Sequence, residues 1–181
     1  MIIMDEEAYV VREELRGRST ESPRGAQQVE LVIFVGLQAS GKSTFFRERF
    51  AATHEHVSKD LFRNNKNRNR RQARLIAAAL RARSSVVVDN TNPTGEDRRP
   101  LIQLGRELGA KIVGYYFEST VRQCVERNRR RAGKDRVPDV AVYATAKKLE
   151  RPSHSEGFDE LFRVRLTDEP AFEVRAETRR G

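Results

Sequence analysis

The residues from Gly36 to Ser43 follow the pattern G-x-x-x-x-G-K-[ST], whose residue types suit the binding of a nucleoside triphosphate. Glycines let backbone N–H groups approach a β-phosphate, and the amino end of the following helix adds further donors. The amine of Lys42 can bridge the β- and γ-phosphates as a catalytic group, and the hydroxyl of Ser43 can ligate magnesium. We therefore predict a site for ATP and Mg²⁺, with Ser43 as metal ligand and the nucleotide held by Gly36, Gln38, Ala39, Ser40, Gly41, Lys42, Ser43 and Thr44.

Asp60 and Arg63 form a second group with chemical potential. They follow the first helix at the point where a second strand is expected to end, so Asp60 should emerge at the carboxyl edge of the sheet, near the γ-phosphate. A carboxylate there can accept the proton of an attacking hydroxyl. Arg63 shares its helix face and can hold a phosphate of the acceptor. The alternative role for Asp60 is that of a helix N-cap.

Asp89 ends the apolar run Val86–Val88, and the polar segment Asn90–Pro93 follows it. An aspartate at the end of a buried strand beside a phosphate-binding loop can contact magnesium, directly or through water, or it can position the acceptor. Asn90–Pro93 is also typical of a simple turn before the next helix. The residue types leave both roles of Asp89 open.

The net charge of +9 is unevenly distributed along the chain. Nine lysines and arginines lie between Lys59 and Arg83 against one aspartate, and six lie between Arg127 and Arg136 against one aspartate. Concentrated positive charge on both sides of a nucleotide site predicts a polyanionic ligand. The competing interpretation of Lys59–Arg83 is an exposed helix face.

Apolar runs and helical periodicities indicate the elements that must position these groups. Strands alternate with helices, and the strands are apolar on both faces, which predicts an α/β fold with a central parallel sheet between helices. The expected strands are 29–35, 84–89, 111–117, 161–166 and 172–174, and the expected helices are 42–52, 70–83, 95–108, 120–131 and 138–149.

The composition suits a globular protein with a charged surface, since 38% of residues are hydrophobic and 34% are charged. No apolar run has the length of a membrane span, and no signal peptide is recognised, so we expect a cytoplasmic protein without a membrane. Cys124, the single cysteine, is expected to be a buried packing residue. The three histidines, His54, His56 and His154, lack metal-ligand spacing and are expected at the surface or in loops.

The motifs together resemble those of a known family, the 5′-kinase domain of polynucleotide kinase from phage and from the animal kinase–phosphatase. The matching segments cover roughly residues 30–166; they are Gly36–Ser43, Ser58–Asp60 with Arg63, Asp89–Pro93, Arg127-Asn128 with Arg131, Val137-Pro138 and Glu156–Phe158. The resemblance implies a three-layer, adenylate-kinase-like P-loop fold. It also implies a P-loop kinase domain at 29–166 with a helical and loop lid around 127–137, between an N-terminal extension, 1–28, and a C-terminal segment, 167–181.

The same resemblance implies a role for each matching residue. Asp60 is the general base for a 5′-hydroxyl, and Arg63 contacts the 3′-phosphate of the terminal nucleotide. Asp89 lies in the acceptor site, with Thr91 and Arg98 as further candidates for binding the acceptor strand. Arg131 belongs to the catalytic lid over the donor phosphates, and Arg127 assists it.

The expected activity is thus ATP-dependent phosphorylation of the 5′-hydroxyl end of DNA or RNA. A P-loop kinase of a small hydroxylated metabolite or antibiotic is the alternative, because it would share the loop, the base and the lid. A non-catalytic nucleic-acid-binding module is a third possibility, which the intact Lys42, Ser43, Asp60 and Asp89 disfavour.

Overall fold

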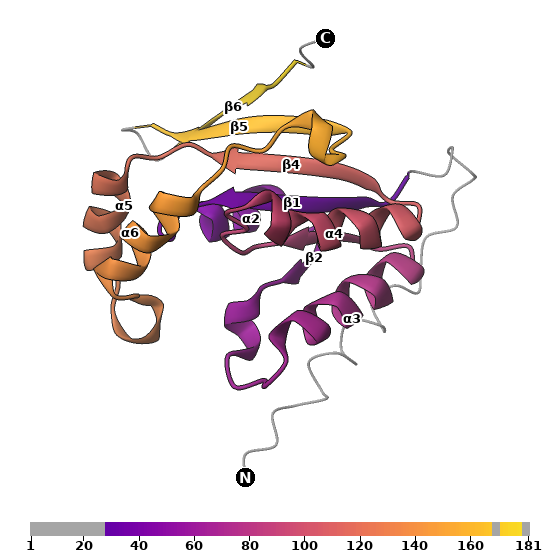
Figure 1. Ribbon diagram of the computed structural model, residues 1–181, viewed down its shortest axis with the longest axis horizontal. Coiled ribbons are helices and arrows are strands. Elements are labelled where there is room, and N and C mark those ends of the chain that lie inside the picture. Colours follow the sequence, from indigo (N-terminus) through magenta and orange to yellow (C-terminus); the bar gives the residue numbers. More distant parts are fainter. Residues whose placement is uncertain (1–27, 168–170, 179–181) are drawn as a thin grey trace.

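Six strands form one sheet in a computed structural model that describes residues 28–167 and 171–178 (Figure 1). The strand order is β2-β3-β1-β4-β5-β6, and all neighbouring pairs are parallel except β5 and β6. The strands are β1 Glu30–Gly36, β2 His54–Val57, β3 Ser85–Val88, β4 Lys111–Phe117, β5 Glu160–Leu166 and β6 Phe172–Ala176. The predicted parallel sheet is confirmed, with one antiparallel strand added at its edge.

In the described part of the chain, five α-helices surround the sheet, close to the predicted positions: α2 Lys42–Arg49, α3 Arg68–Arg81, α4 Gly95–Glu107, α5 Val121–Arg129 and α6 Asp139–Lys148. Helix α3 begins two residues earlier than predicted because the side chain of Asn67 caps it, accepting a hydrogen bond from the backbone N–H of Arg70. Thr94 and Thr120 open α4 and α5 with capping boxes, which fixes where each helix leaves its strand. Three short 3₁₀ turns, η2 Lys59–Phe62, η3 Gly133–Asp135 and η4 His154–Glu156, complete the described elements.

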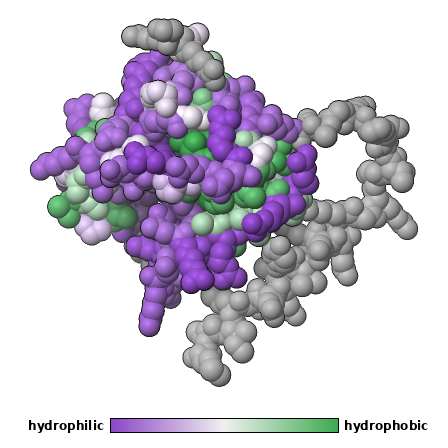
Figure 2. All heavy atoms as spheres, turned by 45° about the vertical axis from the view of Figure 1, so that its right-hand side comes forward, coloured by the Kyte–Doolittle hydropathy of each residue, from purple (hydrophilic) through white to green (hydrophobic). Residues whose placement is uncertain are grey.

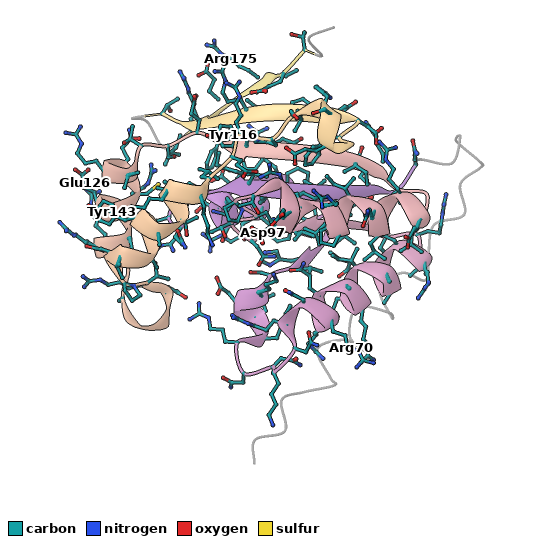
Figure 3. All side chains as sticks on the ribbon, viewed as in Figure 1. Arg70, Asp97, Tyr116, Glu126, Tyr143 and Arg175 are labelled. Atoms are coloured by element: carbon teal, nitrogen blue, oxygen red, sulfur yellow. The ribbon has the colours of Figure 1, made fainter. Side chains whose placement is uncertain are left out.

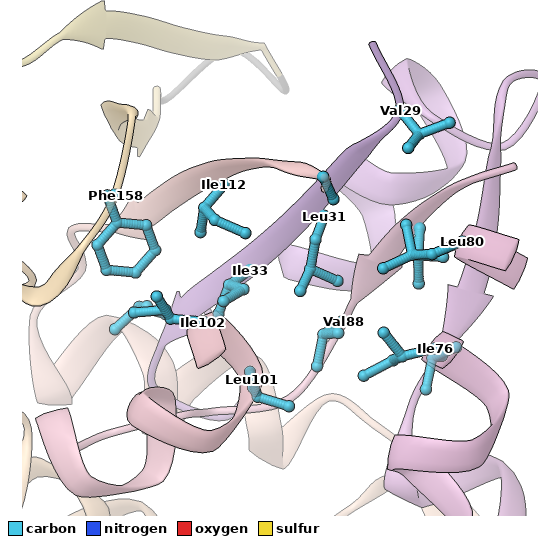
Figure 4. Close-up of a cluster of buried hydrophobic side chains, with 14 of the residues drawn as sticks. Val29, Leu31, Ile33, Ile76, Leu80, Val88, Leu101, Ile102, Ile112 and Phe158 are labelled. Carbon is cyan, nitrogen blue, oxygen red and sulfur yellow. The ribbon is translucent and has the colours of Figure 1, made fainter. Parts of the chain in front are cut away.

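Alternate residues of β1 build the two halves of the core. Leu31, Ile33 and Val35 face α3 and α4, where they pack with Ile76, Leu80, Leu101 and Ile102 (Figure 4). Val32 and Phe34 face the opposite side, against three phenylalanines of α2 and its end, Phe45, Phe46 and Phe50. Because both faces of β1 are covered, the strand is buried along its length, and its carboxyl end is held rigidly between two packed layers.

The segment predicted to follow the domain at 167–181 contributes a strand to the same sheet. Phe172 at the start of β6 packs on Phe45 of α2, with 5.0 Å between the ring centroids. β6 is therefore part of the sheet that carries the phosphate-binding loop, and it is two residues longer than predicted. The predicted extension at 1–28 lies outside the described residues apart from Gln28.

The surface is largely hydrophilic in the view of Figure 2, where hydrophobic residues appear mainly in a central band. Cys124 is fully buried, which confirms its predicted packing role. None of the helices in residues 28–167 and 171–178 combines the length and hydrophobicity needed to cross a bilayer.

Candidate active site

The phosphate-binding loop lies at the carboxyl end of β1 and leads directly into α2, as the sequence pattern predicts. Gly36 approaches β4 so closely that a Cβ there would lie 2.9 Å from Cβ of Phe117, so no larger residue fits. Gly41 adopts φ 100° at the N-cap of α2, a left-handed conformation that glycine adopts without strain. The conformation of the loop therefore requires both glycines, and the N–H groups of the loop lie at the amino end of α2.

Lys42 is buried beneath this loop. Its amine donates hydrogen bonds to the carbonyl oxygens of Gly36 and Leu37 and lies 3.3 Å from the hydroxyl oxygen of Ser40. Burial lowers the pKa of Lys42 from 10.5 to about 8, although the nearby Asp89 carboxylate acts in the opposite direction. The amine thus keeps its charge at neutral pH and is held where phosphate oxygens can replace the two carbonyl groups as acceptors.

Asp89, directly after β3, is hydrogen-bonded to one residue of α2 and one residue of β2. Its Oδ2 accepts a hydrogen bond of 2.7 Å from the hydroxyl of Ser43 and one of 3.2 Å from Nε2 of His56. Burial alone would raise the pKa of Asp89, but the His56 hydrogen bond, the charge of Lys42 and the Ser43 hydrogen bond outweigh burial and hold this pKa below its ordinary value. Asp89 is therefore a buried anion beside the predicted metal ligand.

His56 belongs to this site, which corrects the expectation of a surface or loop position. It lies on β2, where its ring stacks on Phe46 of α2 with 4.0 Å between centroids and an interplanar angle of 15°. His54, two residues earlier on the same face, meets Phe50 edge-on, four residues after Phe46. Residues two apart on a strand share a face, and so do residues four apart on a helix. The spacings of His54 and His56 and of Phe46 and Phe50 are therefore a sequence signal that could have predicted that the two histidine rings pack on the two phenylalanines.

Asp60 lies on the 3₁₀ turn η2, which continues from β2. Ser58, and not Asp60, is the N-cap of this turn, since its hydroxyl oxygen accepts a hydrogen bond of 3.4 Å from the N–H of Asp60. The carboxylate of Asp60 is consequently free of a capping role, and 74% of its side chain is exposed. Nε of Arg63 lies 3.4 Å from Oδ1 of Asp60, as the predicted shared face requires.

The turn Asn90–Pro93 connects the site to its surroundings through polar groups, of which only Thr91 had been given a role from the sequence, as a candidate for binding the acceptor strand. Oδ1 of Asn90 accepts a hydrogen bond of 2.9 Å from the N–H of Lys59, and its Nδ2 donates one of 2.7 Å to Oε1 of Gln72. The carbonyl oxygen of Thr91 accepts a hydrogen bond of 3.0 Å from the N–H of Gly36. The predicted turn thus also fixes the start of η2 and the first residue of the phosphate-binding loop.

Arg98 does not contact the cleft, which corrects its prediction as an acceptor-binding residue. The residue is fully buried, and its Nε and Nη2 donate to the two carboxylate oxygens of Glu156 at 2.6 and 2.8 Å. Its Nη1 donates to the carbonyl oxygens of Asn92, Pro93 and Glu150. With its donors used inside the protein, Arg98 joins the start of α4 to the segment before β5.

Helices α5 and α6 form the base of the predicted lid, and three successive residues of the phosphate-binding loop contact them. Leu37 packs in a cluster with Cys124, Val125 and Val142. Nε2 of Gln38 donates to Oγ1 of Thr145 at 2.9 Å. The carbonyl oxygen of Ala39, a residue with φ 59°, accepts a hydrogen bond of 2.9 Å from Nε of Arg127. The lid base and the loop are therefore joined into one unit.

Arg127 supports the loop from outside and is not among the residues that line the cleft, and its predicted part in nucleotide binding stays a prediction. Its Nη2 donates instead to Oγ of Ser119 at 3.1 Å. Arg131 is exposed, lines the cleft and lies close enough to Lys42 for its charge to contribute to lowering the pKa of that lysine. Of the two arginines predicted to bind the nucleotide, Arg131 lines the cleft and Arg127 contacts the loop from behind.

The lid loop between α5 and α6 is closed at its base by Asn128, which is fully buried. Its Nδ2 donates to the carbonyl oxygen of Val137 at 2.7 Å and to Oδ1 of Asp139 at 3.1 Å. Its Oδ1 accepts a hydrogen bond of 3.1 Å from the N–H of Val137. Residues 130–136 consequently form a loop whose two ends are fixed to each other.

A cleft of about 570 Å³ collects most of the predicted residues at the carboxyl ends of β1, β2 and β3. In Figure 1 the α5–α6 pair lies at one side of this end of the sheet, and the chain after β2 lies at the other. The predicted residues that line the cleft are Gln38, Ala39, Lys42, Ser43, Thr44, Asp60, Arg63, Asp89, Thr91 and Arg131. His56 and Leu61 also line it, and neither had been assigned a role from the sequence.

Two curated proteins resemble this chain. The bifunctional polynucleotide phosphatase/kinase of Schizosaccharomyces pombe is 27% identical over 146 residues, which are 77% of this chain and 34% of that protein. The L-seryl-tRNA(Sec) kinase of Methanococcus maripaludis is 28% identical over 151 residues, which are 71% of this chain and 56% of that protein. The chain therefore spans between about a third and somewhat over half of the length of these relatives.

Among solved structures, a chain of the Pnkp1/Rnl/Hen1 RNA repair complex superimposes with a TM-score of 0.59 at 25% identity, over 72% of this chain and 47% of that chain. A family model described as AAA domain, AAA_33, matches residues 31–152, which is more than half of the chain. That range includes the phosphate-binding loop, Asp60, Asp89 and both lid helices. This chain belongs to the AAA_33 family and is a P-loop kinase domain.

Proposed function

We propose that this domain transfers the γ-phosphate of ATP to the 5′-hydroxyl at the end of a polynucleotide. The observation that carries the proposal is the content of a single cleft. Lys42 and Ser43, which suit a bound triphosphate, lie there with the exposed carboxylate of Asp60 and its neighbour Arg63. A kinase needs these groups in one place, because the hydroxyl must lose its proton while it attacks the γ-phosphorus.

In this proposal Asp60 accepts the proton of the 5′-hydroxyl. The hydroxyl oxygen forms a bond to the γ-phosphorus, and the bond from that phosphorus to the β–γ bridging oxygen breaks, so that ADP leaves with the electron pair. Lys42 and Arg131 stabilise the negative charge on the phosphoryl group during transfer. Arg63, within 3.4 Å of Asp60, binds the 3′-phosphate of the terminal nucleotide and so aligns the hydroxyl with the base.

Magnesium suits the oxygen groups at the end of β3. The hydroxyl of Ser43 and the carboxylate of Asp89 lie 2.7 Å apart, and the pKa of Asp89 is lowered, so a hard cation would find oxygen ligands of the preferred kind. Ser43 and Asp89 would hold the ion together with phosphate oxygens. The ion would supply positive charge against the phosphate oxygens of ATP.

The basic character of the acceptor side supports a nucleic acid acceptor. Arg63 beside the base offers a partner for a phosphate, which a 5′-hydroxyl polynucleotide carries on its 3′ side and an unphosphorylated sugar does not. The relative from Schizosaccharomyces pombe, a polynucleotide phosphatase/kinase, is consistent with this assignment. The relative from Methanococcus maripaludis, an L-seryl-tRNA(Sec) kinase, makes an aminoacyl hydroxyl on RNA the strongest competing acceptor.

The test is transfer of labelled γ-phosphate to a 5′-hydroxyl oligonucleotide, beside seryl-tRNA, nucleosides and a panel of sugars. We expect the oligonucleotide to be labelled and the label to be released by a 5′-phosphatase. Labelling of seryl-tRNA or of sugars alone would refute the proposal. Asp60→Asn should abolish transfer while ATP binding persists, and retained turnover would show that another group is the base.

A further inference from the structure

Helix α3 presents an unusual concentration of positive charge to solvent. It contains five arginines and no acidic residue in 14 positions. All five, Arg68, Arg70, Arg71, Arg74 and Arg81, are exposed, whereas Gln72, Ile76, Ala77 and Leu80 form the buried face. In Figure 3, Arg70 extends away from the sheet. We call the exposed half of α3, with these five arginines, the arginine face.

The arginine face works against the stability of its own helix. Arg68 and Arg70 lie in the first turn, where the helix dipole disfavours positive charge and where no acidic residue is present. Arg70 and Arg74 are like charges four residues apart, which repel each other. The requirements of the helix therefore do not explain these side chains.

Several arginines elsewhere on the surface pair with carboxylates, which provides a comparison for the arginine face. Acidic partners are found for Arg106, Arg129, Arg151, Arg165 and Arg175. For the five arginines of the arginine face, no ion pair is found within residues 28–167 and 171–178. Unpaired, mutually repelling cations on one helix are the arrangement that a polyanion would stabilise.

The arginine face is continuous with the acceptor side of the cleft. Arg63 lines the cleft, and Phe62 precedes it on η2. The guanidinium of Arg71 lies over the ring of Phe62, 5.8 Å from its centroid, and Asn90 joins η2 to Gln72 of α3 through its two hydrogen bonds. Positively charged side chains thus extend from Arg63, beside the proposed base, past η2 and onto α3.

We propose that the arginine face binds the acceptor polynucleotide on the 3′ side of its reacting end, through backbone phosphates and without sequence preference. From Arg68 to Arg81 the helix extends about 20 Å, a length that several phosphates of one strand occupy. The terminal nucleotide sits at Asp60 and Arg63, and the following nucleotides lie on α3. This inference rests on the proposed function, since it concerns the same acceptor.

The experiment compares acceptors of increasing length, from a nucleoside 3′-monophosphate to a 12-nucleotide strand, with the wild-type protein and a triple variant, Arg68→Gln, Arg70→Gln and Arg74→Gln. A matched control removes the same charge from exposed positions of α5 and α6, by Arg122→Gln, Lys147→Gln and Lys148→Gln. The wild-type KM should fall as the acceptor lengthens. In the triple variant the KM of the long strand should rise by roughly tenfold to a hundredfold at 0.1 M salt.

The KM of the 3′-monophosphate and the kcat should stay unchanged in the triple variant, and the control should behave like the wild type. The thermal stability of the triple variant should equal or exceed that of the wild type, because repulsive charges are removed. A KM independent of acceptor length, or equal losses in variant and control, would overturn the inference.

Failure of the proposed function gives a different result, since no oligonucleotide would then be phosphorylated at all. In that case the inference is tested by equilibrium binding of a labelled 12-nucleotide strand. Loss of binding in the triple variant, but not in the control, would support the inference. Equal binding by all three proteins would refute it. The same three proteins are also tested with vesicles of anionic phospholipid. If the triple variant loses binding to the vesicles but keeps binding to the oligonucleotide, the inference is refuted and the arginine face is assigned to a membrane surface.

Discussion

Replacing Asn90 by alanine should weaken both the fold and the reaction. The change removes the acceptor for the N–H of Lys59 and the donor to Oε1 of Gln72, a side chain that is only 5% exposed. A lost hydrogen bond costs about 1 kcal/mol, and a buried acceptor left unsatisfied costs about 1–3 kcal/mol. We therefore expect the free energy of unfolding to fall by roughly 2–4 kcal/mol, which lowers Tm by about 6–12 °C in a domain of this size.

The catalytic effect of Asn90→Ala follows from the position of η2. Lys59 directly precedes Asp60, so the lost hydrogen bond releases the start of the turn that carries the proposed base. A displacement of about 1 Å can reduce the rate by about a hundredfold, and kcat should fall accordingly, while the KM for ATP changes little.

Calorimetric unfolding and steady-state transfer to a 5′-hydroxyl oligonucleotide measure the two effects separately. Asn69→Ala, at an exposed position of α3, is the matched control and should change neither. Asn90→Asp keeps an acceptor for Lys59, and Gln72 can turn its amide to donate, so this variant should lie between wild type and alanine. A lower Tm with unchanged kcat would refute the link to Asp60, and an unchanged Tm would refute the hydrogen bonds themselves.

Three further substitutions test other parts of the site. Arg98→Leu should destabilise the protein by about 3–5 kcal/mol in denaturant unfolding, because it leaves the Glu156 carboxylate without its partner, and acceptor KM should be unchanged in the folded fraction. ATP affinity, measured by calorimetry, should fall as pH rises through about 8, where Lys42 loses the proton that binds phosphate, whereas Lys42→Arg should give a flat profile over that range. His56→Leu should lower kcat about tenfold or more through loss of its hydrogen bond to Asp89, and the loss should nearly disappear in an Asp89→Asn background; additive effects would show that His56 acts elsewhere.

The sequence predicted the framework well because local rules decide it. Gly36 and Gly41 define the loop, and the continuous apolar residues of β1 identify a strand covered on both faces. Each of these features depends on neighbours in the chain, so pattern and structure agree.

The polar connections were harder to predict because their partners lie far apart in the chain. Asn90 and Gln72 are 18 residues apart, and Arg98 and Glu156 are 58 apart. A signal was nevertheless present in the helical periodicity: Arg98 lies on the same face as Leu101 and Ile102, so a charged side chain was directed into the core, where it needed a partner. Read in this way, Arg98 would have been assigned to the interior from the start.

The closure of the lid loop by Asn128 has a consequence for how this domain can diversify. Since Val137 is hydrogen-bonded back to Asn128 in both directions, residues 130–136 are an insert whose length does not alter the path of the chain on either side. The loop can therefore be lengthened or shortened around Arg131, which lines the cleft, without moving α5, α6 or the phosphate-binding loop. The residues of the loop other than Arg131 can in this way change while the groups proposed to hold ATP stay in place.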